Sequence, residues 1–178
     1  PGEEQFNLYA MYEIGWHYNE DGEIDYDKNT SDFRKYGLQK CSYESLGIDP
    51  IEIKPNLTFK NTGPTIEGDY VIIAPHGSAH AKYWNYPGGW QTIIDNLNNR
   101  GYKVVMITQE PLGDEWHDSK LGGTLTGVIN KTGDFPLSER ANDMLNAKAF
   151  IGIGSGLSWV AWALNTPVVM ISGFSEAY

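Results

Sequence analysis

Short apolar runs alternate with helix-like stretches along the second part of this 178-residue sequence. The runs are YVIIAP (70–75), KVVMIT (103–108), the weaker TGVIN (126–130), AFIGIG (149–154) and PVVMISG (167–173). Nearly continuous apolar strands that are joined by helices form parallel sheets with both faces covered. The sequence therefore predicts an α/β fold, a Rossmann-like parallel sheet with helices on both faces.

Three stretches between or after these runs have helical patterns. GWQTIIDNLNNRG (89–101) is amphipathic and ends at Gly101. PLSERANDMLNAK (136–148) begins at Ser138 or at the proline before it. SGLSWVAWALN (155–165) carries two tryptophans three residues apart, which we expect to pack against the core or a neighbouring domain.

Residues 1–65 have a different pattern from residues 66–178, and we expect a domain boundary near residues 60–68. The first region contains, in order, a strand pattern at 6–18, an acidic loop, a helix pattern at 31–48 that stops at Gly47, and a linker with Gly and Pro at 60–69.

The chain carries a formal net charge of −10, from 13 Lys and Arg against 23 Asp and Glu. This charge disfavours nucleic acid and anionic membranes as partners, so a bound phosphate must be held by local groups. No apolar run approaches the roughly 18 residues that span a bilayer, and no signal peptide is visible. The single cysteine, Cys41, can form no internal disulfide and suits a reducing, cytoplasmic location.

The loops after the apolar runs are the expected position of a ligand, because an open parallel sheet binds ligands outside the carboxyl ends of its strands. These loops are rich in glycine and hydroxyl groups, which suits a small polar ligand. They are His76-Gly77-Ser78, Thr108-Gln109-Glu110, Gly154-Ser155-Gly156 and residues 172–175.

The Gly154-Ser155-Gly156 turn is the main candidate for an anion site. Glycines permit unusual backbone dihedrals and close approach of a ligand, and free N–H groups at a helix start carry partial positive charge. A diphosphate is the anion favoured at this position of an α/β sheet, and Lys82 could balance one phosphate. The alternative is a tight strand–helix junction with Ser155 as N-cap and Lys82 as a solvated lysine.

Other chemistries have weaker support. His76 and His80 have the spacing of helical metal ligands, yet no third ligand is near in sequence, so we predict no metal site. There is no Gly-x-Ser-x-Gly elbow and no Cys/His pair at a recognised spacing. The dinucleotide fingerprint is also absent, which disfavours NAD and an epimerase. Trp84 and Trp90 form an aromatic lid or, as we expect, pack in the core.

The order of several motifs resembles the nucleotide-sugar-binding domain of the heptosyltransferases of glycosyltransferase family 9. These motifs are AKYWN (81–85), GYKVVMI (101–107), PLSER (136–140) and AFIGIGSGLSWVAWALNTPVVMISGFS (149–175). Within the family, the sequence is most similar to the bacterial autotransporter heptosyltransferases, which modify serines of adhesin proteins. Residues 32–50 also resemble the segment that ends the first domain of those enzymes.

The resemblance implies a two-domain GT-B architecture. Residues 1–65 would be the tail of the acceptor-side domain plus a linker, and residues 66–178 a donor-binding domain that is incomplete at its C-terminus. The family's catalytic base would precede residue 1, and the iron-binding cysteine-rich element of the autotransporter branch would follow residue 178. We therefore expect a fragment that is inactive by itself, and carry over neither a catalytic residue nor a metal or other cofactor.

The resemblance also implies donor-binding residues. Lys82 matches a lysine that contacts the donor phosphate, and Ser78 matches a hydroxyl of the same loop. The family's Asp-Thr-Gly-Leu turn has glycine here in place of aspartate, and Trp159 replaces a following histidine; the autotransporter branch shares both departures. The expected donor-binding residues are Gly77, Ser78, Lys82, Thr108, Gln109, Gly154, Ser155, Gly156 and Leu157.

The implied reaction is the inverting transfer of a sugar from a nucleotide-diphosphate donor, resembling ADP-heptose, to a hydroxyl of a protein or glycan acceptor. The whole protein would be a bacterial, cytoplasmic glycosyltransferase, and a homo-oligomer is left open. The alternative is a non-catalytic nucleotide-sugar-binding or interaction module that has kept the sheet and lost the enzyme.

Overall fold

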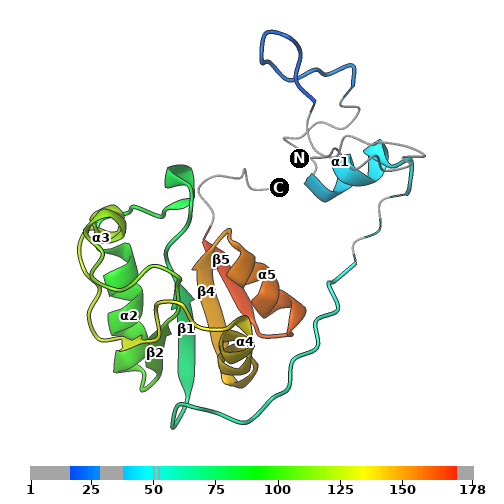
Figure 1. Cartoon of the computed structure of the whole chain (residues 1–178). Helices are drawn as coiled ribbons and strands as arrows, with labels where there is room; N and C mark the ends of the chain where they lie inside the picture. Colours follow the sequence, from blue (N-terminus) through cyan, green and yellow to red (C-terminus); the bar gives the residue numbers. More distant parts are fainter. Residues whose placement is uncertain (1–16, 29–37, 50, 52, 172–178) are drawn as a thin grey trace, which may run out of the picture. The chain divides into compact units, whose positions relative to one another are not determined.

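The computed structural model describes residues 17–28, 38–49, 51 and 53–171 (Figure 1). The chain divides into two compact units between Ile53 and Lys54. Among the described residues, no helix has the length and apolar character needed to cross a membrane.

The first unit contains helix α1, Leu38–Ser45. Gly47, at a φ of +66°, follows the helix and donates its N–H to the carbonyl of Glu44, which confirms the predicted stop. An antiparallel bridge joins Tyr18 to Ile24 across a turn. Most of the strand predicted at 6–18 and the first part of the predicted helix lie outside the described residues.

The second unit is built on a parallel sheet with the strand order β3-β2-β1-β4-β5, which confirms the predicted fold (Figure 1). The strands are β1 Tyr70–Ala74, β2 Lys103–Met106, β3 Ile129–Asn130, β4 Ala149–Ile153 and β5 Val168–Ile171. All five residues of β1 are buried, and Ile72 pairs with Val105 on one side and with Phe150 on the other. β1 is therefore the centre of the sheet, and the strands leave it in both directions.

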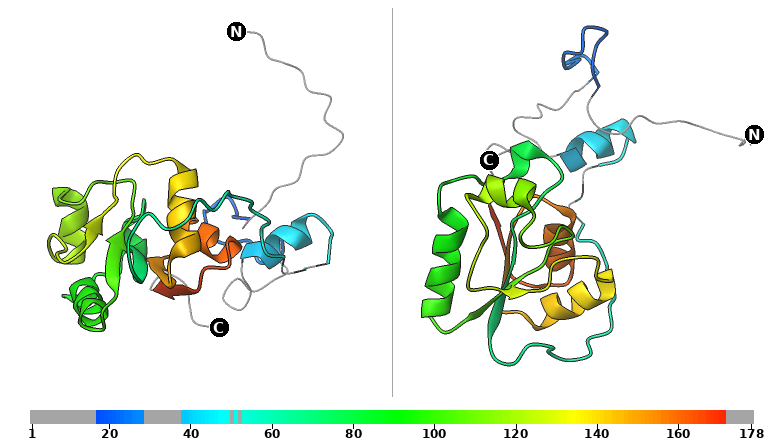
Figure 2. Two further views of the ribbon diagram at one scale, coloured as in Figure 1. Left: turned by 90° about the horizontal axis from the view of Figure 1, so that it is seen from below. Right: turned by 60° about the vertical axis from the view of Figure 1, so that its left-hand side comes forward.

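Helices cover both faces of the sheet, as predicted (Figures 1 and 2). Helix α2, Gly89–Asn99, and helix α3, Glu115–Leu121, contribute to an apolar cluster that contains the fully buried Trp90. Helix α4, Leu137–Asn146, and helix α5, Gly156–Ala163, pack on the other face. The core position predicted for Trp90 is confirmed.

Two details of the helices differ from the predictions. Pro136, not Ser138, occupies the N-cap position of α4, so the proline alternative is the correct one. Trp159 of α5 is 52% exposed, so of the two expected positions, the core and the contact with a neighbouring domain, the core is excluded for this side chain.

Helix α3 was missed, because seven residues give no readable apolar period. Its ends do carry signals: Asp114 caps the first turn by accepting the N–H of His117, and Gly122 follows the last turn at a φ of +85°.

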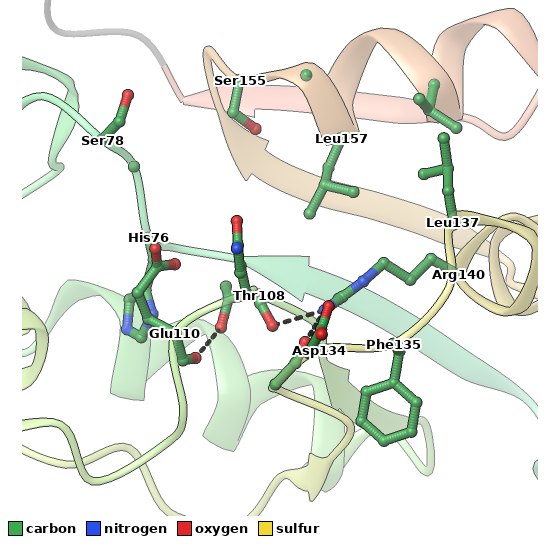
Figure 3. Close-up of a pocket in the computed structure, with 15 residues that line it drawn as sticks. His76, Ser78, Thr108, Glu110, Asp134, Phe135, Leu137, Arg140, Ser155 and Leu157 are labelled. Carbon is green, nitrogen blue, oxygen red and sulfur yellow. Dashed lines mark hydrogen bonds between the residues drawn. The ribbon is translucent and has the colours of Figure 1, made fainter.

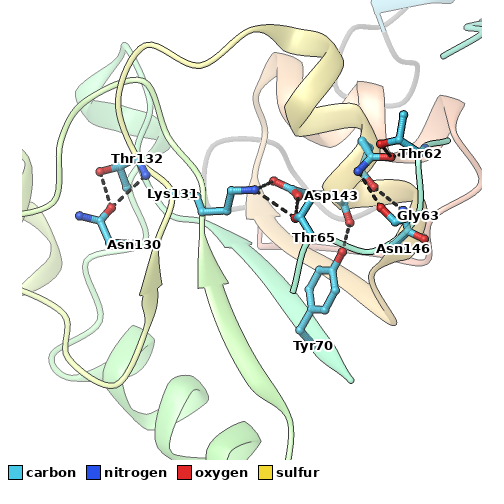
Figure 4. Close-up of polar contacts among 10 residues, drawn as sticks. Thr62, Gly63, Thr65, Tyr70, Asn130, Lys131, Thr132, Asp143 and Asn146 are labelled. Carbon is cyan, nitrogen blue, oxygen red and sulfur yellow. Dashed lines mark hydrogen bonds and ion pairs between the residues drawn. The ribbon is translucent and has the colours of Figure 1, made fainter. Parts of the chain in front are cut away.

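The segment that precedes β1 packs on α4 through a buried polar network (Figure 4). The Asp143 carboxylate is 2% exposed; it forms an ion pair with Lys131 and accepts a hydrogen bond of 2.7 Å from Thr65. The Tyr70 hydroxyl donates to the Asp143 carbonyl at 2.7 Å, and burial raises the pKa of this tyrosine to about 12. Asn142 accepts the N–H of Thr62 at 2.8 Å. Residues 62–65, part of the predicted linker, are thus fixed to the second unit.

We expect Lys131→Met to lower the free energy of unfolding by about 3 kcal/mol, because it leaves the buried Asp143 carboxylate without its cation. The matched control is Lys148→Met, whose pair with Asp69 at 3.2 Å is exposed on both sides and should contribute less than about 1 kcal/mol. Urea denaturation of both variants measures the difference. Equal losses would contradict a stabilising role of the buried pair.

Candidate functional site

A cavity of about 520 Å³ lies at the carboxyl ends of β1 and β2 and at the start of α5 (Figure 3). The loops that follow β1 and β2 line the cavity, and α4 forms one wall. The lining residues are His76, Gly77, Ser78, Thr108, Gln109, Glu110, Gly133, Asp134, Phe135, Leu137, Arg140, Ser155, Gly156, Leu157 and Val160. The cavity thus forms where parallel strands are expected to bind a ligand.

The structure brings together most of the residues that the sequence singled out. Seven of the nine expected donor-binding residues line the cavity: Gly77, Ser78, Thr108, Gln109, Ser155, Gly156 and Leu157. Lys82 and Gly154 are not among the lining residues. Lys82 ends the short 3-10 helix His80–Lys82, and its stem lies against Gly77, where an added Cβ would be 3.5 Å from Lys82 Cβ.

The turn before α5 is open toward the cavity. Ser155 occupies the N-cap position in an extended conformation, but its side chain makes no capping hydrogen bond. Its Oγ is buried and has no hydrogen-bond partner among the described residues. The first N–H groups of a helix have no acceptor within the helix, so the start of α5, where Ser155 and Gly156 line the cavity, offers donors to a polar group.

The glycines of this turn correct one expectation. Neither Gly154 nor Gly156 has a positive φ, so the turn does not need the conformational freedom of glycine. A Cβ added at Gly156 would meet nothing within 4 Å, and one added at Gly154 would meet only Met170, at an ordinary 3.9 Å. The protein's own packing therefore leaves room for a side chain at both positions.

The end of β2 is held by side chains. Thr108 is buried, and its hydroxyl donates to the Glu110 carbonyl at 2.8 Å. The Thr108 carbonyl accepts a hydrogen bond of 2.8 Å from Nη2 of Arg140. The Thr108 hydroxyl thus fixes the conformation of this loop, and its proton is already donated within the protein.

Arg140 of α4 is the main residue that the sequence reasoning missed. It is 6% exposed, and its Nη2 also donates to the carbonyl of Gly133. Its Nη1 is buried without a partner among the described residues, and burial lowers the pKa of the guanidinium. An arginine on an amphipathic helix is normally predicted to lie on the solvent-exposed face. The available signal was its spacing, since Arg140 lies four residues before the buried Met144 and so shares its face.

A second group of side chains surrounds His76, which is 5% exposed. Both ring nitrogens lack a hydrogen-bond partner within the described part of the chain, and the ring lies 5.0 Å from that of His117. Asp114 fixes His117 through its Nδ1 at 2.7 Å. Burial, and then the neighbouring His117, lower the pKa of His76 to about 4. The imidazole of His76 is therefore neutral at pH 7.

Among residues 17–28, 38–49, 51 and 53–171, no three or more His, Cys, Asp or Glu side chains are grouped so that they could hold a metal ion. The ring of His80 instead lies edge-on to Trp116, 5.9 Å away between centroids. We assign no metal ligand within these residues.

Residues 29–177 match the profile of Glycosyltransferase family 9 (heptosyltransferase). Autotransporter heptosyltransferase BAHTCr of Citrobacter rodentium is 38% identical over 170 residues, 94% of this chain and 39% of that protein. Inactive autotransporter heptosyltransferase BimC of Burkholderia thailandensis is 32% identical over 140 residues, 79% of this chain and 32% of that protein.

A solved structure is similar over nearly the whole chain. It is the dodecameric, iron-containing heptosyltransferase TibC of Escherichia coli in complex with ADP-D-beta-D-heptose. It matches with a TM-score of 0.74 at 38% identity, covering 94% of this chain and 42% of that chain. The present chain thus spans less than half the length of these relatives.

The buried His76 predicts a pH dependence of stability. Its pKa is about 4 in the folded protein against an ordinary 6.5, so below pH 6.5 the unfolded chain binds a proton that the folded chain does not. The free energy of unfolding should fall by up to about 1.4 kcal/mol per pH unit as the pH decreases from about 6.5 to about 4.

Denaturation at pH 7, 6 and 5 measures this dependence. His76→Leu should show a flatter profile than the wild type, whereas the exposed His80→Gln should keep the wild-type profile. Identical profiles for wild type and His76→Leu would contradict the buried, neutral imidazole.

Proposed function

The chain belongs to glycosyltransferase family 9, and on that premise we propose that the cavity binds the nucleoside diphosphate of a sugar donor. The whole protein is then a heptosyltransferase that transfers a heptose from an ADP-linked donor to an acceptor hydroxyl, with inversion at the anomeric carbon. The complex of the relative TibC with ADP-D-beta-D-heptose supports this choice of donor.

One observation carries the proposal: the turn at 154–156 is shaped for something other than the chain itself. A glycine in a helix costs about 1 kcal/mol relative to alanine, and Gly156 opens α5 with neither a positive φ nor a crowded Cβ position to require it. A phosphate close to the main chain would require it. The unpartnered Ser155 hydroxyl beside it supports the same ligand.

The proposed chemistry follows from charge. As the acceptor hydroxyl attacks the anomeric carbon and the glycosidic bond to the diphosphate breaks, negative charge develops on the leaving diphosphate. The N–H groups of the α5 start and the hydroxyl groups of Ser78 and Ser155 stabilise that charge. Lys82, whose stem lies beside Gly77, extends its ammonium to the phosphate when the donor binds. The base that deprotonates the acceptor is assigned to no residue of this chain.

The remaining parts of the proposal concern the whole protein. Residues 1–65 are the tail of an acceptor-side domain plus a linker, and residues 66–178 belong to the donor-side domain of a GT-B enzyme. The acceptor is a protein or a glycan, and the protein forms a homo-oligomer, which the dodecamer of TibC supports. A cytoplasmic location is supported by the single cysteine, Cys41.

A second candidate function is a non-catalytic module that binds the nucleotide sugar. The relative described as inactive, BimC, favours it, because a chain of this family can lack activity. Both candidates bind the donor, and only the transferase moves the heptose to an acceptor. Release of ADP from ADP-heptose by the whole protein, in the presence of acceptor, distinguishes them.

Binding is tested by titrating the chain with ADP, UDP, GDP and CDP while the amide chemical shifts of Gly77, Ser155 and Gly156 are recorded. We expect saturable shifts with ADP. Gly156→Ala should leave the fold as stable as the wild type or more so, yet weaken ADP at least about tenfold, because its methyl group occupies the space of the phosphate.

Two further variants complete the test. Ser155→Ala should weaken ADP about tenfold by removing the hydroxyl donor, and Lys82→Ala by a similar factor. Unchanged ADP affinity in Gly156→Ala would contradict a phosphate at this turn, and the turn would then be a strand–helix junction.

A further inference from the structure

Arg140 lines the cavity, and its Nη1 group is a buried donor that has no acceptor among the described residues. Arg140 is 6% exposed, and its guanidinium forms no ion pair with the described residues. The second terminal nitrogen, Nη2, donates to the carbonyls of Thr108 and Gly133. A buried charged donor without an acceptor costs free energy, so an acceptor from outside the chain is favoured there.

The surroundings of Arg140 disfavour a phosphate as that acceptor. Asp134 and Glu110 also line the cavity, and Asp143, Asp134 and Glu110 all act electrostatically on the guanidinium. A further anion here would be repelled by these carboxylates, whereas a neutral acceptor such as a ring nitrogen would not.

The remaining neighbours are apolar. Phe135 lies 6.0 Å from the guanidinium carbon, measured to its ring centre, and Leu137, Leu157 and Val160 line the cavity as well. Such side chains suit a flat aromatic ring. In Figure 3, Phe135, Leu137 and Arg140 lie on one side of the cavity and Ser78 on the other, with Ser155 and Leu157 between them at the start of α5. A nucleotide with its diphosphate at Ser155 therefore extends its base toward Arg140.

We propose that Arg140 recognises the base of the nucleotide donor, with Nη1 donating a hydrogen bond to a ring nitrogen of adenine. This proposal rests on the proposed function, which supplies the nucleotide. Arg140 thereby has two roles: Nη2 fixes the wall of the cavity, and Nη1 contacts the ligand. Lysine cannot reproduce both, because the planar guanidinium presents its donors in a fixed fork.

The experiment compares the full chain with Arg140→Lys and Arg140→Met, using ADP and inorganic pyrophosphate as probes. Both variants should bind ADP about tenfold more weakly than wild type and bind pyrophosphate as the wild type does. Retained pyrophosphate binding shows that the phosphate end is intact, so a loss of ADP affinity is not a loss of fold. Arg100→Met, which removes an exposed arginine at the end of α2, is the control for net charge.

Analogues of ADP locate the contact. Each of 1-deaza-, 3-deaza- and 7-deaza-ADP lacks one ring nitrogen of adenine. For the analogue that lacks the nitrogen bound by Nη1, the wild type should bind about tenfold more weakly than it binds ADP. Arg140→Lys should bind that analogue and ADP equally, because the variant and the analogue remove the two partners of the same hydrogen bond. Equal ADP affinity of wild type and both variants overturns the inference, as does a parallel loss of pyrophosphate or the absence of coupling with all three analogues. Failure of the wild type to bind any nucleoside diphosphate overturns the proposed function itself.

Discussion

The parallel pairing of β1 with β2 on one side and β4 on the other is the constraint on which the candidate site depends. Parallel neighbours cannot be joined by a hairpin, so each connection must cross a face of the sheet before the next strand begins. All strands then end at the same edge. The loops that begin at His76, Thr108 and Gly154 meet there although they are far apart in the sequence, and the cavity follows from this connectivity.

The strands of the second unit were predictable because buried parallel strands appear in a sequence as continuous apolar runs. β1 is buried at every position, so it reads as a continuous apolar run with no ambiguity of face. The same reasoning could not find Arg140 or Asp143. Both are charged residues on α4, and charge on an amphipathic helix normally marks the solvated face, so their burial depends on tertiary partners such as Thr108 and Lys131.

For the glycine-rich turn at 154–156, the sequence predicted the position but left the reason for the glycines open. Its position beside a ligand cavity was predictable, because a strand end and a helix start coincide there. Two reasons for the glycines were expected from the sequence, unusual backbone dihedrals and close approach of a ligand. The structure removes the first reason at Gly156, which has no positive φ, and its open Cβ position agrees with the second.

Helix α4 carries both a residue that lines the cavity and a residue of the buried polar network. Arg140 faces the cavity and holds the carbonyls of Thr108 and Gly133, whereas Asp143, one turn later, holds Lys131. The loop that carries Lys131 and Gly133 is also bonded to β2, through main-chain hydrogen bonds of 2.9 Å to the carbonyls of Met106 and Thr108. This loop is therefore fixed between the sheet and α4 by both of its ends. The position of Arg140 in the cavity then depends on the buried ion pair, although that pair touches no part of the cavity itself.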